Sequence, residues 1–121
     1  MIECMVVGLG GFLGSVCRYL VGLIPLKEGL TFPVKTFVIN ILGSFLIGII
    51  AAAAAKNSSV NPRVVLLLKV GVCGGFTTFS SFALESGELI KNGNLYVAVT
   101  YVVLSVVLGI LAVFTGEAII K

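Results

Sequence analysis

The residues Gly71 to Phe82, with the sequence GVCGGFTTFSSF, decide how this chain folds. They lie in the middle of the third of four long apolar segments. Glycines weaken a helix, and the hydroxyl side chains that follow them offer the backbone other hydrogen-bond partners. The stretch therefore predicts an interruption in the third helix. A glycine-softened kink, in which serines and threonines bond back to their own helix, is the alternative.

The composition of the chain places it in lipid. Of the 121 residues 59% are apolar and only 11% are charged, which is far from the balance of soluble domains. A membrane-spanning helix needs about 20 apolar residues. The segments long enough for this are 2–24, 33–55, 62–90 and 95–120, and their connections are short. We expect an all-α integral membrane protein, a single four-helix transmembrane domain over residues 1–121.

The predicted interruption would then lie at mid-membrane depth. Non-helical backbone there is tolerated only where it is buried in protein or lines a watery cavity, because an unsatisfied amide or carbonyl in hydrocarbon costs several kcal/mol. Free carbonyls at such a break suit a cation, and the N-terminus of the half-helix that follows suits an anion. An interrupted third helix is therefore a candidate ion site.

Several functional classes are excluded by the charged and sulfur-containing residues. The net charge is +3, but the eight basic residues are scattered singly, so we expect no nucleic-acid partner. The cysteines Cys4, Cys17 and Cys73 have no CxxC spacing and the chain has no histidine, which argues against a disulfide framework, zinc and haem. We expect free, buried thiols and no enzymatic activity.

The Lys and Arg residues give the chain no preferred orientation. With four spans, the side of the termini carries Lys56, Arg63, Lys69 and Lys121, and the other side carries Arg18, Lys27, Lys35 and Lys91. An excess normally marks the cytoplasmic side, and here the eight divide equally. Copies inserted both ways up can pair about a two-fold axis in the membrane plane, so we expect an antiparallel, dual-topology homodimer. The alternative is a weak bias that the count misses, because Lys69 falls inside a segment.

Small residues recur at helical spacing and predict close helix packing. Gly10 and Gly14 form a GxxxG pair, and Ser44 and Gly48 repeat the spacing. A third stripe follows one face of the last segment, with Ser105, Gly109, Ala112 and Gly116. Small residues let helix backbones approach closely in lipid, where the hydrophobic effect gives helices no reason to associate. We expect a compact bundle that forms oligomers.

Neutral hydrogen-bond donors, rather than acids, occupy the apolar segments. Asn40 supplies an amide, and hydroxyls come from Thr77, Thr78, Ser80, Ser81, Tyr101 and Ser105. The acids Glu3, Glu28, Glu85, Glu88 and Glu117 lie away from the segment centres. Hydrogen bonds to an anion are charge-assisted and can replace its hydration shell. The pattern indicates an anionic cargo and argues against a proton-coupled cation exporter.

Two phenylalanines and one arginine add to this donor set. Phe79 and Phe82 are three residues apart beside the hydroxyls, and aromatic ring edges carry partial positive charge. Packing is the more common role of such residues. Arg18, near the end of the first segment, either extends to the membrane interface or provides positive potential at a vestibule.

At this point the residues resemble a known family, the Fluc (CrcB) fluoride channels of bacteria and other microbes. The resemblance runs the length of the chain. Its most specific parts are GGFLG at 10–14 with Arg18 and Tyr19, NILGSF at 40–45, and above all GGFTTFSSF at 74–82.

The resemblance implies a dual-topology homodimer of four-helix subunits in the cell membrane, with two fluoride pores. Backbone carbonyls matching Gly74 and Thr77 of both subunits would hold a central, structural sodium ion. The pore positions would be Phe79, Phe82, Asn40, Ser80, Ser81, Tyr101 and Ser105, with Arg18 in a vestibule. Glu85 matches an acidic position to which no role is assigned. The implied activity is passive fluoride efflux, which protects the cell from fluoride toxicity.

One position departs from the family pattern, and two other function classes remain open. Some relatives have a serine where this chain has Gly109, which puts the outermost polar site in doubt. A small multidrug exporter would need a carboxylate deep in the first helix, whereas Glu3 lies at its start. A non-transporting assembly subunit would explain the glycine stripes but not the interruption lined by hydroxyls and flanked by phenylalanines.

Overall fold

The computed structural model describes residues 1–27 and 29–120, and these residues form helices joined by short connections. The first, second and last segments are α1 (Ile2–Gly22), α2 (Val34–Lys56) and α6 (Leu95–Ile119). The third is divided into α3 (Pro62–Val65), η1 (Leu66–Cys73), α4 (Gly74–Phe76) and α5 (Phe79–Lys91). Within the described residues, four helical stretches are long and apolar enough to cross a membrane.

The helical stretches end close to the residues expected from the sequence. α1 stops at Gly22 instead of residue 24, and the other outer limits differ from the expectation by at most one residue. The third segment is not a regular α-helix, because η1 is wound as a wider π-helix and two extended residues separate α4 from α5. Two residues of the sequence argument, Glu28 and Lys121, lie outside the described part of the chain.

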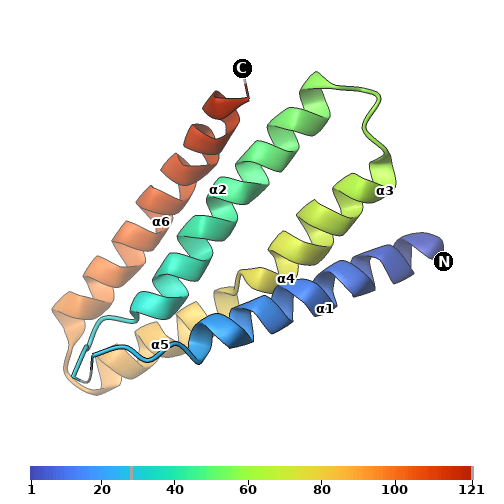
Figure 1. Ribbon diagram of the computed structural model, residues 1–121. Helices are drawn as coiled ribbons and strands as arrows, with labels where there is room; N and C mark the ends of the chain where they lie inside the picture. The colour runs from blue at the N-terminus through green and yellow to red at the C-terminus, as the bar shows by residue number, and fades with distance from the viewer. Residues whose placement is uncertain (28, 121) are drawn as a thin grey trace.

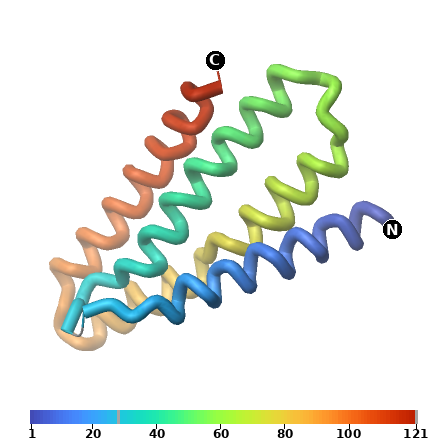
Figure 2. The backbone as a smooth tube through the Cα atoms, in the orientation of Figure 1, coloured from blue at the N-terminus to red at the C-terminus, as the bar shows by residue number. Residues whose placement is uncertain are grey.

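The helices associate as two pairs that diverge from each other (Figure 1). One pair is α2 with α6, and the other is α1 with η1 and α4. The tube in Figure 2 shows both termini away from the end where the α1–α2 and α5–α6 connections meet. The second pair contacts the first chiefly where η1 passes α2, and α5, which continues the third segment, contacts α6. The interruption between α4 and α5 therefore lies between the two pairs.

Glycines bring α1 against the third segment. Gly10 and Gly14 are both buried, and a Cβ atom added to Gly10 would lie 2.8 Å from the Cα of Gly71. A Cβ on Gly14 would lie 2.8 Å from the backbone nitrogen of Phe76. Because these neighbours are backbone atoms, they cannot move aside as a flexible side chain would. The GxxxG pair predicted from the sequence is the contact surface of α1.

The α2–α6 pair is packed in the same way. Gly48 and Gly116 are buried, and a Cβ on Gly116 would lie 3.0 Å from the backbone nitrogen of Ile49. Ala112 is also buried in this contact surface. Near the chain end, Lys56 Nζ donates a 2.9 Å hydrogen bond to the carbonyl of Ile120, which ties the last turn of α6 to α2.

The expectation that all three thiols are buried is wrong. Cys73 is buried at 3% exposure, whereas Cys4 and Cys17 are exposed on α1. Gly10 and Gly14 direct one face of α1 toward η1 and α4. Cys17, three residues after Gly14, lies near this face but is still exposed, and Cys4 is exposed near the start of the helix. An apolar residue in a membrane helix is stable against lipid, so apolar context alone does not predict burial inside the protein.

The contact between α1 and η1 predicts a sharp difference between two glycines of one helix. Gly10→Ala places a methyl group against the backbone of η1 and is expected to lower the free energy of unfolding by about 1–3 kcal/mol. Gly8→Ala, two residues away, meets nothing within 4 Å and is the matched control. Thermal unfolding of the purified protein in detergent measures both. Equal stability of the two variants would contradict the packing described here.

Candidate functional site

Thr77 and Thr78 interrupt the third helical segment. Their backbone is extended, with φ and ψ of −83° and 160° for Thr77 and of −149° and 124° for Thr78. The backbone nitrogen and Oγ1 of Thr77 both donate to the carbonyl of Cys73, at 3.0 Å and 2.9 Å. Thr78 is the N-cap of α5, because its Oγ1 accepts a 3.1 Å hydrogen bond from the backbone nitrogen of Ser81. Each threonine thus stabilises one side of the interruption.

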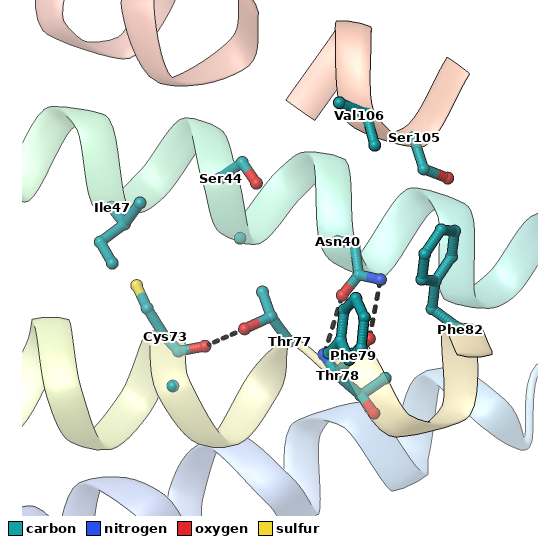
Figure 3. Close-up of a pocket in the computed structure, with 12 residues that line it drawn as sticks. Asn40, Ser44, Ile47, Cys73, Thr77, Thr78, Phe79, Phe82, Ser105 and Val106 are labelled. Carbon is teal, nitrogen blue, oxygen red and sulfur yellow. Dashed lines mark hydrogen bonds between the residues drawn. The ribbon is translucent and has the colours of Figure 1, made fainter. Parts of the chain in front are cut away.

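The side-chain amide of Asn40 bridges the extended backbone from α2 (Figure 3). Its Oδ1 accepts a 2.8 Å hydrogen bond from the backbone nitrogen of Thr78, and its Nδ2 donates a 3.0 Å hydrogen bond to the carbonyl of the same residue. The amide therefore replaces both partners that a continuous helix would have given Thr78. A carboxamide can do this because it combines an acceptor with a donor.

The interruption leaves backbone carbonyls without helical partners. In a continuous α-helix the Thr78 nitrogen would donate to the Gly74 carbonyl, but here it donates to Asn40. Within residues 1–27 and 29–120, no hydrogen bond reaches the carbonyl oxygens of Gly74 or Thr77 outside regular helical bonding. The Gly75 carbonyl receives a 3.3 Å hydrogen bond from Arg18 Nε.

A pocket of about 360 Å³ opens beside the interruption, between α2, α6 and the third segment. Figure 3 shows the Asn40 side chain of α2 pointing to Thr78 beside the ring of Phe79. The Phe79 and Phe82 ring centroids are 5.8 Å apart. Phe79 is 78% exposed in the single chain. The lining residues are Asn40, Gly43, Ser44, Ile47, Cys73, Gly74, Thr77, Thr78, Phe79, Phe82, Ser105 and Val106.

Ser105 supplies the pocket with a hydroxyl that lacks a partner. Its Oγ is buried and, among the described residues, has no hydrogen-bond partner. A buried hydroxyl without a partner is expensive, so such an atom indicates a ligand, a water or a further chain. Gly109 lies one turn further along α6, where a Cβ would lie 3.7 Å from Ser44 Oγ. The hydroxyl of Ser44 is thus next to Gly109, and the doubt about the outermost polar site stays open.

Glu85 forms a second polar cluster, near the end where the α1–α2 and α5–α6 connections meet. Thr36 Oγ1 donates to its Oε2 at 2.8 Å, and the Tyr101 hydroxyl donates to its Oε1 at 2.9 Å. Tyr101 is completely buried, and its ring centroid lies 5.0 Å from that of Phe82. Sequence reasoning missed Thr36. The available signal was its position four residues before Asn40, which places both on one face of α2.

The predicted site residues therefore lie in four places. The residues at the pocket are Asn40, Phe79, Phe82, Ser105, Gly74 and Thr77. Ser80 and Ser81 begin α5 next to it, with Ser80 Oγ 3.5 Å from Thr78 Oγ1. Tyr101 lies behind Phe82 with its hydroxyl bound to Glu85, and Arg18 lies on the α1 side of the interruption.

Comparisons with known proteins match this chain over nearly all of its length. The family described as "CrcB-like protein, Camphor Resistance (CrcB)" matches residues 5–117. Three similar curated proteins are each named "Fluoride-specific ion channel FluC". The one from Chlorobaculum tepidum is 45% identical over all of this chain and 96% of its own length. Those from Chlorobium luteolum and Rhizobium meliloti are 44% and 43% identical, over 95% and 100% of this chain and 89% and 98% of their own lengths.

The bridge from Asn40 predicts a large effect of its removal on stability. Asn40→Ala leaves both backbone groups of Thr78 without their partners, and we expect the free energy of unfolding to fall by about 1–3 kcal/mol. Asn40→Asp keeps the acceptor but loses the donor, so it should also destabilise the protein. Ser44→Ala, one turn along the same helix, is the control. If thermal unfolding of Asn40→Ala equals that of Ser44→Ala, the bridge does not stabilise the interruption.

Proposed function

The chain belongs to the CrcB family, and from this premise we propose that it is a fluoride channel that lets the anion leave the cell passively. The observation that carries the proposal is the pocket at the interrupted segment, where neutral donors gather without a carboxylate among the lining residues that the structure describes. Like its relatives, the chain is a multi-pass membrane protein of a transport family and not an enzyme.

The donors of the pocket suit a small, strongly hydrated anion. Ser105 Oγ has no partner within the described chain, and only one N–H bond of the Asn40 amide is used by the Thr78 carbonyl. The N-terminus of α5 adds partial positive charge at Phe79 and Ser80. Hydrogen bonds from such groups to fluoride are charge-assisted and offset the loss of its hydration shell.

The remaining site residues extend this pocket into a path. Fluoride would pass the ring edges of Phe79 and Phe82, which carry partial positive charge. The hydroxyls of Ser80 and Ser81 continue the path at the start of α5, and Tyr101 lies behind Phe82. Arg18 would contribute positive potential in a vestibule on the α1 side while its Nε holds the Gly75 carbonyl.

We also propose that two copies of opposite orientation form the channel, with two pores. Phe79 is 78% exposed at the edge of the pocket that Asn40 and Ser105 line, so a second subunit that closed this open pocket would also cover the phenylalanine ring. The described basic residues support dual topology, since Lys56, Arg63 and Lys69 lie toward one end and Arg18, Lys27, Lys35 and Lys91 toward the other, without a strong bias.

The carbonyl oxygens of Gly74 and Thr77 fit a sodium ion at the centre of such a dimer. Carbonyls of unwound backbone are the ligands that sodium takes in membrane transport proteins, and these two lack other partners among the described residues outside helical bonding. No group of three or more His, Cys, Asp and Glu that could hold a metal occurs within residues 1–27 and 29–120, so carbonyls are the donors available. The ion would supply a fixed positive charge that holds the two interruptions together.

Fluoride release from liposomes tests the proposed function. The purified protein is reconstituted with potassium fluoride inside, valinomycin balances charge, and chloride release is measured in a parallel preparation. We expect rapid fluoride release with little chloride leak. Release of neither ion from correctly folded protein, or equal release of both, would rule out a selective fluoride channel.

One variant sharpens this experiment at the pocket. Ser105→Ala removes a donor without breaking a recorded hydrogen bond, so stability should be unchanged while fluoride release slows by about tenfold. Ser86→Ala is the control, because its hydroxyl bonds the Phe82 carbonyl at 2.8 Å outside the pocket. If Ser105→Ala releases fluoride as fast as wild type, Ser105 does not contribute to the fluoride path.

Labelling and mass measurements test the proposed assembly. Ser58→Cys places a thiol in the α2–α3 connection of a chain with Cys4 and Cys17 replaced by serine. If both orientations insert, a reagent that cannot cross the membrane should label about half of these thiols in intact cells. Labelling of all or none would show a single orientation. Native mass spectrometry should give two chains with one sodium ion, and a dimer that never retains sodium would rule out the ion.

A further inference from the structure

A second pocket, of about 260 Å³, lies where the α1–α2 connection meets α5. We propose that this pocket is the charged mouth of the fluoride path, where Lys27 and Lys35 concentrate the anion before it reaches the hydroxyl cluster around Glu85. The proposal rests on the proposed function. It assigns an anion-gathering site to residues outside the pocket at the interrupted segment.

The position of the pocket connects it to that first pocket. Its lining includes Lys27, Lys35, Thr36 and Glu85. Thr36 and Glu85 are joined by a 2.8 Å hydrogen bond, and Glu85 is in turn bonded by the buried Tyr101. The Tyr101 ring packs against Phe82, which lines the first pocket. A continuous series of contacts therefore leads from the mouth to the interruption.

The charges of the pocket explain why an anion path needs cations here. The Glu85 carboxylate receives its two recorded hydrogen bonds from the neutral hydroxyls of Thr36 and Tyr101. Among residues 1–27 and 29–120, no Lys or Arg lies within ion-pair distance of it. Its negative charge would repel an entering anion. Lys27 and Lys35 line the same pocket, so among the described lining residues the two positive charges outnumber the one carboxylate, although Glu28 of the same connection carries a further formal negative charge.

Lys35 is held in place at the mouth. Its Nζ donates a 2.6 Å hydrogen bond to the carbonyl of Gly22, the last residue of α1. This contact also stabilises the carbonyl end of α1, so a structural role alone would explain it. Lys27 is exposed and makes no side-chain hydrogen bond to the other residues that the structure describes, so it separates the two explanations. Glu28, which follows Lys27, lies outside the described residues and is left unchanged in every variant.

The dependence of flux on ionic strength tests the proposal. The Debye length falls from about 30 Å at ~10 mM salt to about 3 Å at ~1 M, so an electrostatic contribution must fade with added salt. Initial rates of fluoride release are measured for wild type, Lys27→Glu, Lys35→Arg and Lys91→Glu at both ionic strengths, with an impermeant anion. Lys91 is the matched control, an exposed lysine at the same end of the bundle that does not line the pocket.

We expect Lys27→Glu to slow release by about two- to fourfold at low salt and to match wild type at high salt. Lys35→Arg keeps charge and hydrogen bond and should stay near wild type. Lys91→Glu should have less than half the effect of Lys27→Glu. Three results would each contradict the proposed role of the lysines without contradicting the proposed channel. They are equal rates for Lys27→Glu and wild type, equal effects of Lys27→Glu and Lys91→Glu, and an effect that persists in high salt. If the wild type releases no fluoride, both proposals fail.

Discussion

The structure depends on satisfying the backbone groups of two extended residues in the middle of an apolar bundle. The Thr77 nitrogen still donates to the Cys73 carbonyl as in a helix, but the Thr78 backbone cannot make its helical bonds, and in lipid it has no water to bond. The carboxamide of Asn40 satisfies both the nitrogen and the carbonyl of Thr78, whereas the Thr77 carbonyl is left for another ligand. Because Asn40 is fixed on α2, this solution also sets the distance between α2 and the third segment.

Close helix packing makes that distance possible. Gly43 lies on α2 opposite the side chain of Thr77, where a Cβ would collide with the threonine methyl group. Gly10 and Gly14 hold α1 against the other side of the same segment. The interruption is thus clamped between two glycine-lined helices. The cost is an incomplete surface, because the single chain leaves the pocket open and Phe79 exposed.

The sequence predicted the positions of the helices better than it predicted which side chains form hydrogen bonds with each other. Apolar runs and turn residues located each helical stretch to within about two residues, since length and hydropathy dominate in lipid. The polar composition of the 71–82 stretch indicated where regular helix would be difficult. It did not indicate that Asn40, 38 residues earlier in the chain, bonds the Thr78 backbone, because that pairing depends on how the helices pack. The prediction that all three cysteines are buried was wrong for a related reason. Apolar residues suit both a lipid-facing surface and the protein interior, so the sequence does not distinguish the two.

The acid at Glu85 is the hardest residue to reconcile with an anion path, and its neighbours suggest the resolution. A carboxylate bonded by two hydroxyls directs their hydrogens toward itself, so the lone pairs of Thr36 and Tyr101 face outward. Such a cluster repels an anion unless positive charge lies nearby or the hydroxyls turn to donate to the ion instead. Lys27 and Lys35 supply the charge in the same pocket. On the proposed path, the carboxylate would act as an alternative acceptor that takes the hydroxyl hydrogens back once the anion has moved on, which would keep the binding at this position weak enough for passage.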